Sequence, residues 1–266
     1  MTLPRIEFNG AAASADDMRH LVQTNYGHFT AMRVEGGGVR GLDLHLDRLD
    51  AATRELFGMP LDHTRVRAYL CHAIAGAREL SLRVNVFSRS LDREHLTRSV
   101  EPDVLVIANE PRAASSDPLR LKSFVYVREA AALKHVGTFP LFHYRRLAQL
   151  AGFGDALFAD AHGRISEGSI WNIGFIDDEG IVWPEALQLT GATMQLLQAG
   201  LARARIASVT RPIHLHELGR FRAAFFTNAG VPVRPIASID GHRFEIDAKW
   251  LATLMRCYES NPLQAP

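Results

Sequence analysis

The stretch DALFADAHGRISEGSIWNIGFIDDEGIVWP (155–184) constrains the fold more than any other part of the chain. Apolar runs alternate there with the turn signals AHGR and DDEG, a pattern that predicts successive short strands rather than a helix. A buried strand is also expected in AAFFTNAG (223–230). Helical patterns accompany these strands in FHYRRLAQLAGF (142–153), in TGATMQLLQAGLARARI, where we expect the helix to start at Thr190, and in DAKWLATLMRCY (247–258). The C-terminal half is therefore predicted to be a lobe of mixed sheet and helix.

The N-terminal half begins with a predicted hairpin. FTAMRVEGGGVRGLDLHLDRL starts as an apolar strand, turns at Gly36–Gly38 and continues as a second strand. Two helices and two strands are expected after it, over 45–58, 62–77, 80–89 and 103–109. A run rich in Pro, Ser and Ala then indicates a boundary. We predict a mixed α+β and α/β fold with a small α+β N-terminal domain (1–110), a linker (111–120) and a larger α/β C-terminal domain (121–266).

Composition and charge argue against several classes of function. The net charge is +1 and the arginines are interspersed with acids, so we expect no nucleic-acid partner. No apolar run reaches the roughly 18 residues that a membrane span needs. Cys71 and Cys257 have no CxxC context, which predicts neither a disulfide framework nor a zinc site and fits a reducing cytosol. The N-terminus lacks the features of a signal peptide, so we expect a cytoplasmic protein.

Common cofactor motifs are missing from the sequence. The chain has no GxxxxGK[ST] motif and no GxGxxG motif between a predicted strand and a helix, which disfavours ATP and NAD, and it has neither GxSxG nor HExxH. His214 and His216 lie on one face of a segment that we expect to be extended, without a third ligand nearby. We therefore predict no metal site.

Lys134 has the most unusual setting of any charged residue. It is one of only three lysines, and in REAAALKHVGTFP it follows an alanine-rich apolar run. An exposed loop lysine would explain it. So would a nucleophilic amine, because an apolar setting lowers the pKa of an ammonium and keeps the amine neutral. The residues alone leave both explanations open.

A set of polar residues elsewhere in the chain favours the nucleophile. Glu167 ends a predicted strand, Thr193 lies in a glycine-led helix start, and Arg48 is on the inward side of the first helix. A polar turn, TNAG, follows a buried strand. A nucleophilic amine, a carboxylate and anion-binding elements are the parts that a pyridoxal phosphate site needs. Each has an ordinary structural explanation when taken singly, and their order along the chain favours the site.

From about Tyr26 to Gly241 the sequence resembles the class IV aminotransferases, the fold-type IV pyridoxal phosphate enzymes. These include branched-chain and D-amino acid aminotransferases and aminodeoxychorismate lyases. The resemblance implies that Lys134 forms the Schiff base with pyridoxal 5′-phosphate, that Glu167 bonds the pyridine nitrogen and that Arg48 contacts the phosphate. It implies further cofactor contacts in EGSIWN, LTGATM and TNAG, from Asn172, Ala192, Thr193, Asn228 and Ala229. It also implies a homodimer.

The reaction stays open at this stage. We predict an aminotransferase that moves an amino group between an amino acid or amine and a 2-oxo acid, because the Asn-Arg pair of the lyases is missing after the lysine. The alternative is an aminodeoxychorismate lyase, which makes 4-aminobenzoate and pyruvate, and Phe29–Thr30 in FTAMRV favours it. A protein that kept the fold and lost catalysis is a third hypothesis. No partner for the cofactor's ring oxygen is assigned. The predicted substrate contacts are His28, Thr30, and two arginines that could bind a carboxylate, Arg89 and Arg234.

Overall fold

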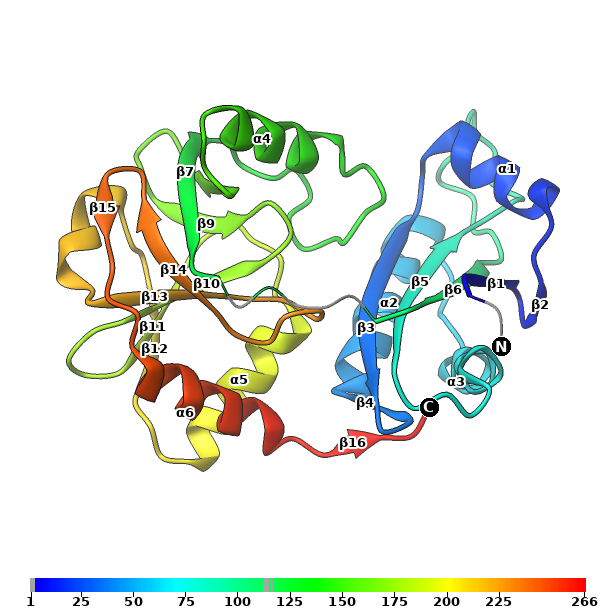
Figure 1. Ribbon diagram of the computed structural model, residues 1–266. Helices are drawn as coiled ribbons and strands as arrows, with labels where there is room; N and C mark the ends of the chain where they lie inside the picture. The colour runs from blue at the N-terminus through cyan, green and yellow to red at the C-terminus, as the bar shows by residue number, and fades with distance from the viewer. Residues whose placement is uncertain (1–2, 112–114, 116) are drawn as a thin grey trace. The chain divides into compact units, whose positions relative to one another are not determined.

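The computed structural model describes residues 3–111, 115 and 117–266, and the described residues form two compact units (Figure 1). The first unit takes in the described residues within Met1–Ala113, together with Leu133–Gly137 and Pro262–Pro266. The second takes in those within Ala114–Ala132 and Thr138–Asn261. Part of the predicted linker, 112–114 and 116, lies outside the described residues, and the last two linker positions already belong to a strand. The C-terminal half of the chain thus contributes two short segments to the first unit.

The first unit is built on an antiparallel sheet with the strand order β16-β4-β3-β5-β6-β1-β2. Its strands are β1 (Arg5–Phe8), β2 (Ala11–Ala12), β3 (His28–Glu35), β4 (Gly38–Arg40), β5 (Leu80–Phe87), β6 (Asp103–Asn109) and β16 (Leu263–Gln264). Side chains alternate between the two faces of such strands. On one face, Met32, Val84 and Val106 pack with apolar residues of helices α2 (Leu42–Phe57) and α3 (His63–Ile74). This core fixes the orientation of β3 and β5, whose other face is then available for polar side chains.

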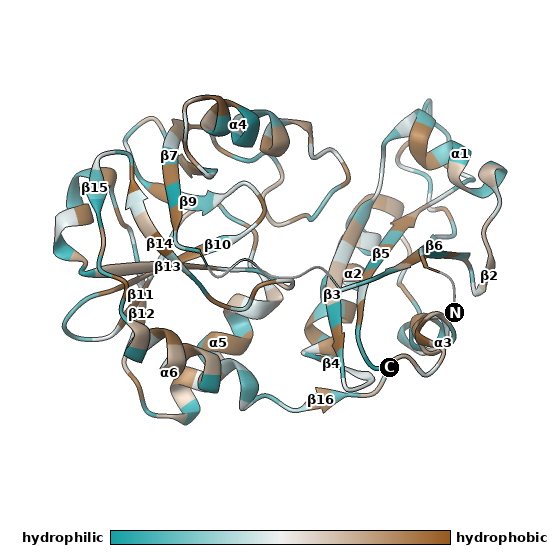
Figure 2. Ribbon diagram, in the orientation of Figure 1, coloured by the Kyte–Doolittle hydropathy of each residue, from teal (hydrophilic) through white to brown (hydrophobic). Residues whose placement is uncertain are grey.

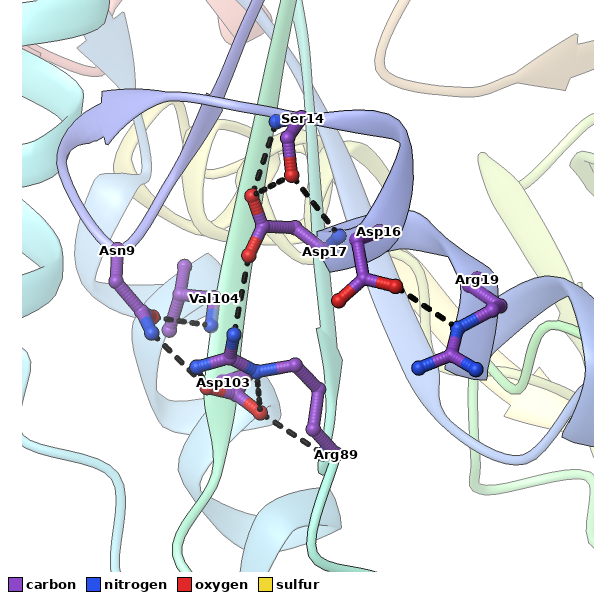
Figure 3. A network of polar contacts seen from close by, with 8 residues as sticks. All are labelled: Asn9, Ser14, Asp16, Asp17, Arg19, Arg89, Asp103 and Val104. Carbon is purple, nitrogen blue, oxygen red and sulfur yellow. Dashed lines mark hydrogen bonds and ion pairs between the residues drawn. The ribbon is translucent and has the colours of Figure 1, made fainter.

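Helix α1 (Ala15–Thr24) packs on the other face of the same sheet, where its Met18 contacts a cluster that contains Phe87. Figure 3 shows what holds α1 in place. Arg89 lies 3.0 Å from Asp17 of α1 and 3.3 Å from Asp103 at the start of β6. Asp17 also closes a capping box with Ser14 at the start of α1. The helix, which was not predicted, is therefore anchored by ion pairs as well as by apolar contacts.

The second unit is built on a mixed sheet with the strand order β12-β11-β10-β13-β14-β7-β8-β9, and β15 pairs with β14. Its strands are β7 (Leu119–Val125), β8 (Asp155–Ala159), β9 (Ile165–Gly168), β10 (Asn172–Ile176), β11 (Ile181–Pro184), β12 (Ser208–Arg211), β13 (Ala223–Thr227), β14 (Arg234–Ile239) and β15 (His242–Arg243). Strand β9 pairs with both β8 and β10, so the sheet closes on itself around an apolar interior that includes Phe175 and Phe226. Its helices are α4 (Phe139–Leu150), α5 (Ala192–Arg203), the short 3-10 helix η1 (Leu215–Arg220) and α6 (Ala248–Glu259).

The predicted mixture of sheet and helix is confirmed, including the hairpin and the strand series over 155–184. Figure 2 shows both hydrophilic (teal) and hydrophobic (brown) residues along α3 and α4. The predicted helix start at Thr190 is wrong: α5 begins at Ala192, because Gly191 keeps an extended backbone. The segment of His214 and His216 is extended only in part: His214 has an extended backbone and bridges to Arg164, but His216 lies in η1. None of the helices in the described ranges has the length and apolar character needed to cross a membrane.

Candidate functional site

Lys134 lies in a short segment that pairs with the N-terminal end of β3. The Phe29 amide donates to the Lys134 carbonyl at 2.9 Å, and the Val136 amide donates to the Gly27 carbonyl at 3.0 Å. His28 and His135 face each other across this pairing. Strand β4 pairs only with the far end of β3, so β4 and the Lys134 segment both lie along the same edge of β3. Lys134 is therefore partly buried and fixed by backbone hydrogen bonds.

The ammonium of Lys134 shares an aromatic ring with an arginine that the sequence did not single out. Its Nζ lies 4.9 Å from the centroid of the Phe29 ring, and the guanidinium carbon of Arg83 lies 3.5 Å from the same centroid. Arg83 Nε donates to Asn85 Oδ1 at 3.0 Å, and burial lowers the pKa of Arg83. In the described part of the chain no carboxylate forms an ion pair with Arg83. Its guanidinium is therefore in position to receive an anionic group near Lys134.

Arg48 belongs to a hydrogen-bonded chain beneath the sheet. Its Nη2 donates to Thr30 Oγ1 at 2.5 Å, and Thr30 Oγ1 lies 2.7 Å from His45 Nδ1. Burial, followed by the charges of Arg48 and Lys134, lowers the pKa of His45 to about 3. The imidazole is thus neutral, and since a guanidinium only donates, the Thr30 hydroxyl accepts from Arg48 and donates to His45. These hydrogen bonds hold the guanidinium of Arg48 in a defined orientation.

His28 and Thr30 both project from β3 toward α2, the helix that contains Arg48. His28 Nε2 bonds Thr53 Oγ1 of α2 at 3.0 Å. Burial, with a smaller contribution from the charge of Arg48, lowers the pKa of His28 to about 3. His28 is therefore a neutral, buried residue. Thr30 differs from it, because its hydroxyl touches Arg48 directly.

In the second unit, Glu167 and Asn172 are paired across strands β9 and β10. Glu167 lies 3.7 Å from Arg128, and both side chains are only 5% exposed. Arg128 was missed in the sequence, where it looks like one of many scattered arginines. Glu167 is therefore an ion-paired carboxylate that water scarcely reaches.

The start of α5 and Asn172 are built together. Asn172 Nδ2 donates to the Leu189 carbonyl at 2.7 Å, and its Oδ1 lies against Gly191 where any side chain would collide. Ala192 and Thr193 follow in the buried first turn of α5. No side chain of the described ranges caps the amides of this turn, and such amides attract anions. The predicted Asn172, Ala192 and Thr193 are therefore neighbours in the fold.

The turn after β13 brings Asn228 to the same region of the second unit. Asn228 Oδ1 accepts from the amides of Gly230 and Val231, and its Nδ2 donates to the Ile170 carbonyl at 3.5 Å. Ala229 lies inside this turn. Just before it, Thr227 Oγ1 is buried and has no hydrogen-bond partner among the described residues. A buried hydroxyl without a partner is costly, which favours a ligand at this position.

The two arginines predicted to bind substrate are engaged by the protein. Arg89 is held between Asp17 and Asp103 (Figure 3). Arg234 Nε donates to the Asp117 carbonyl at 2.7 Å, and its Nη2 lies 3.3 Å from Ser115 Oγ. No group of His, Cys, Asp and Glu side chains within the described ranges could hold a metal ion. Of Arg83, Arg89 and Arg234, Arg83 is thus the best placed to bind a carboxylate from outside the protein.

A comparison with family models matches residues 27–239 to amino-transferase class IV. No curated protein matches the chain. Solved structures do: a protein assigned as 4-amino-4-deoxychorismate lyase from Legionella pneumophila is 20% identical, with a TM-score of 0.79 over 91% of this chain and 93% of that chain. The branched-chain amino acid aminotransferase of Escherichia coli is 17% identical, with a TM-score of 0.83 over 97% and 94%. A hypothetical aminotransferase from Mycobacterium tuberculosis, solved in a PLP-bound form, is 18% identical, with a TM-score of 0.80 over 95% and 97%. At these identities the likeness concerns the fold.

Proposed function

Because the chain belongs to the class IV aminotransferase family, we propose that it moves an amino group between an amino acid or amine and a 2-oxo acid, with Lys134 as the reacting amine. Enzymes of this family work with pyridoxal 5′-phosphate. The observation that carries the proposal is the position of Lys134, whose ammonium and the guanidinium of Arg83 lie against one ring, that of Phe29. This shared contact supports a site in which the reacting amine and a cation for the substrate lie beside the same ring.

The residues present fit this cofactor. Its phosphate needs donors and positive charge, and the resemblance to the family assigns it to two elements that have them: Arg48 carries the charge, and the first turn of α5 has uncapped amides. Its pyridine nitrogen needs a carboxylate, and the buried carboxylate of Glu167 supplies one. The buried hydroxyl of Thr227, which lacks a partner within the described part of the chain, adds a donor next to Asn228 and Ala229. The bound cofactor would supply a ring that takes up electrons from the substrate's α-carbon.

Each residue then has a limited task. The Lys134 amine takes the proton from the substrate's α-carbon and returns a proton at the end of the transfer. The amine must therefore be neutral when it is no longer bonded to the cofactor. Glu167 holds a proton on the pyridine nitrogen. Arg48, oriented by Thr30 and His45, holds the phosphate in place. Asn172 holds Gly191, so that the amides of the α5 start stay in position.

We further propose that Arg83 binds the substrate carboxylate. Arg83→Gln is expected to raise KM for carboxylate substrates by about 10- to 100-fold, because hydrogen bonds to charged groups are among the strongest that proteins make. The same variant should leave KM for an amine without a carboxylate nearly unchanged. Steady-state kinetics with an amino acid and its decarboxylated amine measure this difference.

A matched control comes from the same strand pair. Arg33 lies two positions beyond Ala31, the residue opposite Arg83, but it is ion-paired with Glu35 at 3.3 Å and Glu79 at 3.6 Å. Arg33→Gln should not separate the two substrates. If Arg33→Gln and Arg83→Gln gave the same KM pattern, the assignment of Arg83 would be wrong.

The lyase remains the second candidate because of Thr30. Its hydroxyl contacts Arg48 at the position where aminotransferases of the family usually carry Glu, and the Legionella protein of similar fold is assigned as a lyase. The test supplies 4-amino-4-deoxychorismate and measures pyruvate and 4-aminobenzoate, alongside amino transfer to pyruvate or 2-oxoglutarate. We expect amino transfer. Release of pyruvate and 4-aminobenzoate without amino transfer would replace the aminotransferase by the lyase.

We also propose a cytoplasmic homodimer. Resemblance to the family supports the dimer, in which each site would be closed by a loop of the other subunit. The two cysteines, exposed Cys71 and buried Cys257, are both free thiols, as suits a reducing compartment.

A further inference from the structure

The turn Gly168–Trp171 connects the residues assigned to the cofactor in the second unit. Glu167 immediately precedes this turn, and Asn172 immediately follows it. The Gly168 amide donates to the Trp171 carbonyl at 2.9 Å, which closes the turn. Asn228 donates to its Ile170 carbonyl, so the turn after β13 rests on it as well. A shift of this one turn would move Glu167, Asn172 and Asn228 together.

A buried carboxylate from another strand holds this turn. Asp155, the first residue of β8, is only 2% exposed. Its Oδ1 accepts from Ser169 Oγ at 2.7 Å and from the Ala156 amide at 2.8 Å. Its Oδ2 accepts from Trp171 Nε1 at 3.0 Å and lies 3.4 Å from Arg145 Nε of α4. Both oxygens are therefore occupied, and two of their partners, Ser169 and Trp171, belong to the turn itself.

The contact to Trp171 determines the geometry of the turn. The indole ring lies directly against the α-carbon of Gly168, where a side chain would collide with it. It also packs against Phe226, with 5.2 Å between ring centroids. A tilt of the indole would push on Gly168, the neighbour of Glu167. The bond from Trp171 to Asp155 opposes that tilt.

We propose that Asp155 is a positioning residue of the cofactor site, which fixes the turn Gly168–Trp171 and through it the places of Glu167 and Asn172. The inference rests on the proposed function, since that function assigns Glu167 and Asn172 to the cofactor. Asp155 itself is assigned no contact with the cofactor. Its effect comes from where it holds Ser169 and Trp171.

The test measures binding of pyridoxal 5′-phosphate to the protein freed of cofactor, together with near-ultraviolet circular dichroism of the tryptophans. Asp155→Asn keeps the size of the side chain but turns an acceptor into a donor that faces other donors. We expect its Kd for pyridoxal 5′-phosphate to rise by about 10- to 100-fold, because the lost bonds involve a charged group. The dichroism signal of Trp171 should weaken at the same time.

Two milder variants keep the carboxylate, in case Asp155→Asn folds poorly. Ser169→Ala and Trp171→Phe each remove one donor, and each should raise the Kd by about 3- to 10-fold. Combining Trp171→Phe with Asp155→Asn should raise the Kd by less than the product of the two single effects, because both act through one contact.

Glu7→Gln is the matched control. Glu7 is as buried as Asp155 and is paired with Arg5 and with His72 at 2.9 Å, but it belongs to the first unit. Glu7→Gln should lower thermal stability and leave the Kd for pyridoxal 5′-phosphate unchanged. A folded Asp155→Asn protein with the wild-type Kd and dichroism would overturn the inference, as would a Glu7→Gln protein with an equally raised Kd. A wild-type protein that binds no pyridoxal 5′-phosphate would instead overturn the proposed function, and this inference with it.

Discussion

Lys134→Ala is expected to lower turnover by about 10³-fold or more and to remove the visible absorption of the bound cofactor, because the variant loses both the covalent amine and the group that moves the proton. Absorption spectra and steady-state rates of the purified proteins measure the two effects. Cofactor affinity should fall less than turnover, since Arg48 and the α5 start, which we propose as phosphate contacts, are unchanged. A variant that stays yellow and active would contradict the assignment of Lys134.

The scarcity of lysine makes this experiment unusually clean. The chain has only two other lysines, Lys122 and Lys249. Lys122 lies 5.4 Å from the centroid of the Phe153 ring, and Lys249 is in α6, so neither belongs to the proposed site. Lys122→Ala and Lys249→Ala should keep the absorption and the activity. Borohydride reduction of the protein with bound pyridoxal 5′-phosphate fixes the cofactor to the lysine that holds it. Peptide mapping should then find the cofactor on the peptide that contains Lys134, and not on the peptides that contain Lys122 or Lys249.

Glu167→Gln should slow turnover by about 10²- to 10³-fold, the usual effect of removing one preorganised electrostatic group from an active site. The glutamine keeps the shape of the side chain but carries no charge to hold a proton on the pyridine nitrogen. The visible band of the bound cofactor should shift as well. Steady-state kinetics and a pH titration of that band measure the change.

The loss of the ion pair with Arg128 requires a separate control. Removing one partner of a buried pair costs about 3–5 kcal/mol, so Glu167→Gln should also lower stability. Arg128→Gln removes the same pair but keeps the carboxylate, and it should lose similar stability with a much smaller effect on turnover. Equal losses of turnover in both variants would mean that Glu167 acts through folding alone.

Most of the regular structure could be predicted because its signals are local. Asp62 caps α3 by accepting from the amides of Thr64 and Arg65, and Gly58 ends α2 with a left-handed backbone. Helix α1 also has a local signal, the capping box of Ser14 and Asp17, but none of its residues is fully buried, so no buried apolar face marks it. Its anchor, the ion pair of Asp17 with Arg89, joins residues far apart in the sequence.

The residues of the candidate site also differ in whether a local sequence pattern marks them. The residues within EGSIWN and LTGATM lie in short motifs, so their family pattern could be recognised from the sequence. Arg83 could not be found that way, because only the pairing of β3 with β5 brings it to Phe29. Asp155 likewise gains its importance from its contacts with Ser169 and Trp171, and Arg128 from its contact with Glu167. Such contacts depend on strand pairing, which no local pattern specifies.

The composition of the first unit has a consequence for the order in which the protein assembles during synthesis. Its sheet draws on residues of the N-terminal half, on Leu133–Gly137 and on strand β16 near residue 264. A ribosome would therefore have released all residues between Arg40 and Leu263 before β4 could pair with β16. The edge of β4 that later pairs with β16 stays exposed during that time, and exposed edges invite pairing with other chains. We expect the nascent protein to depend on chaperones most strongly in that interval.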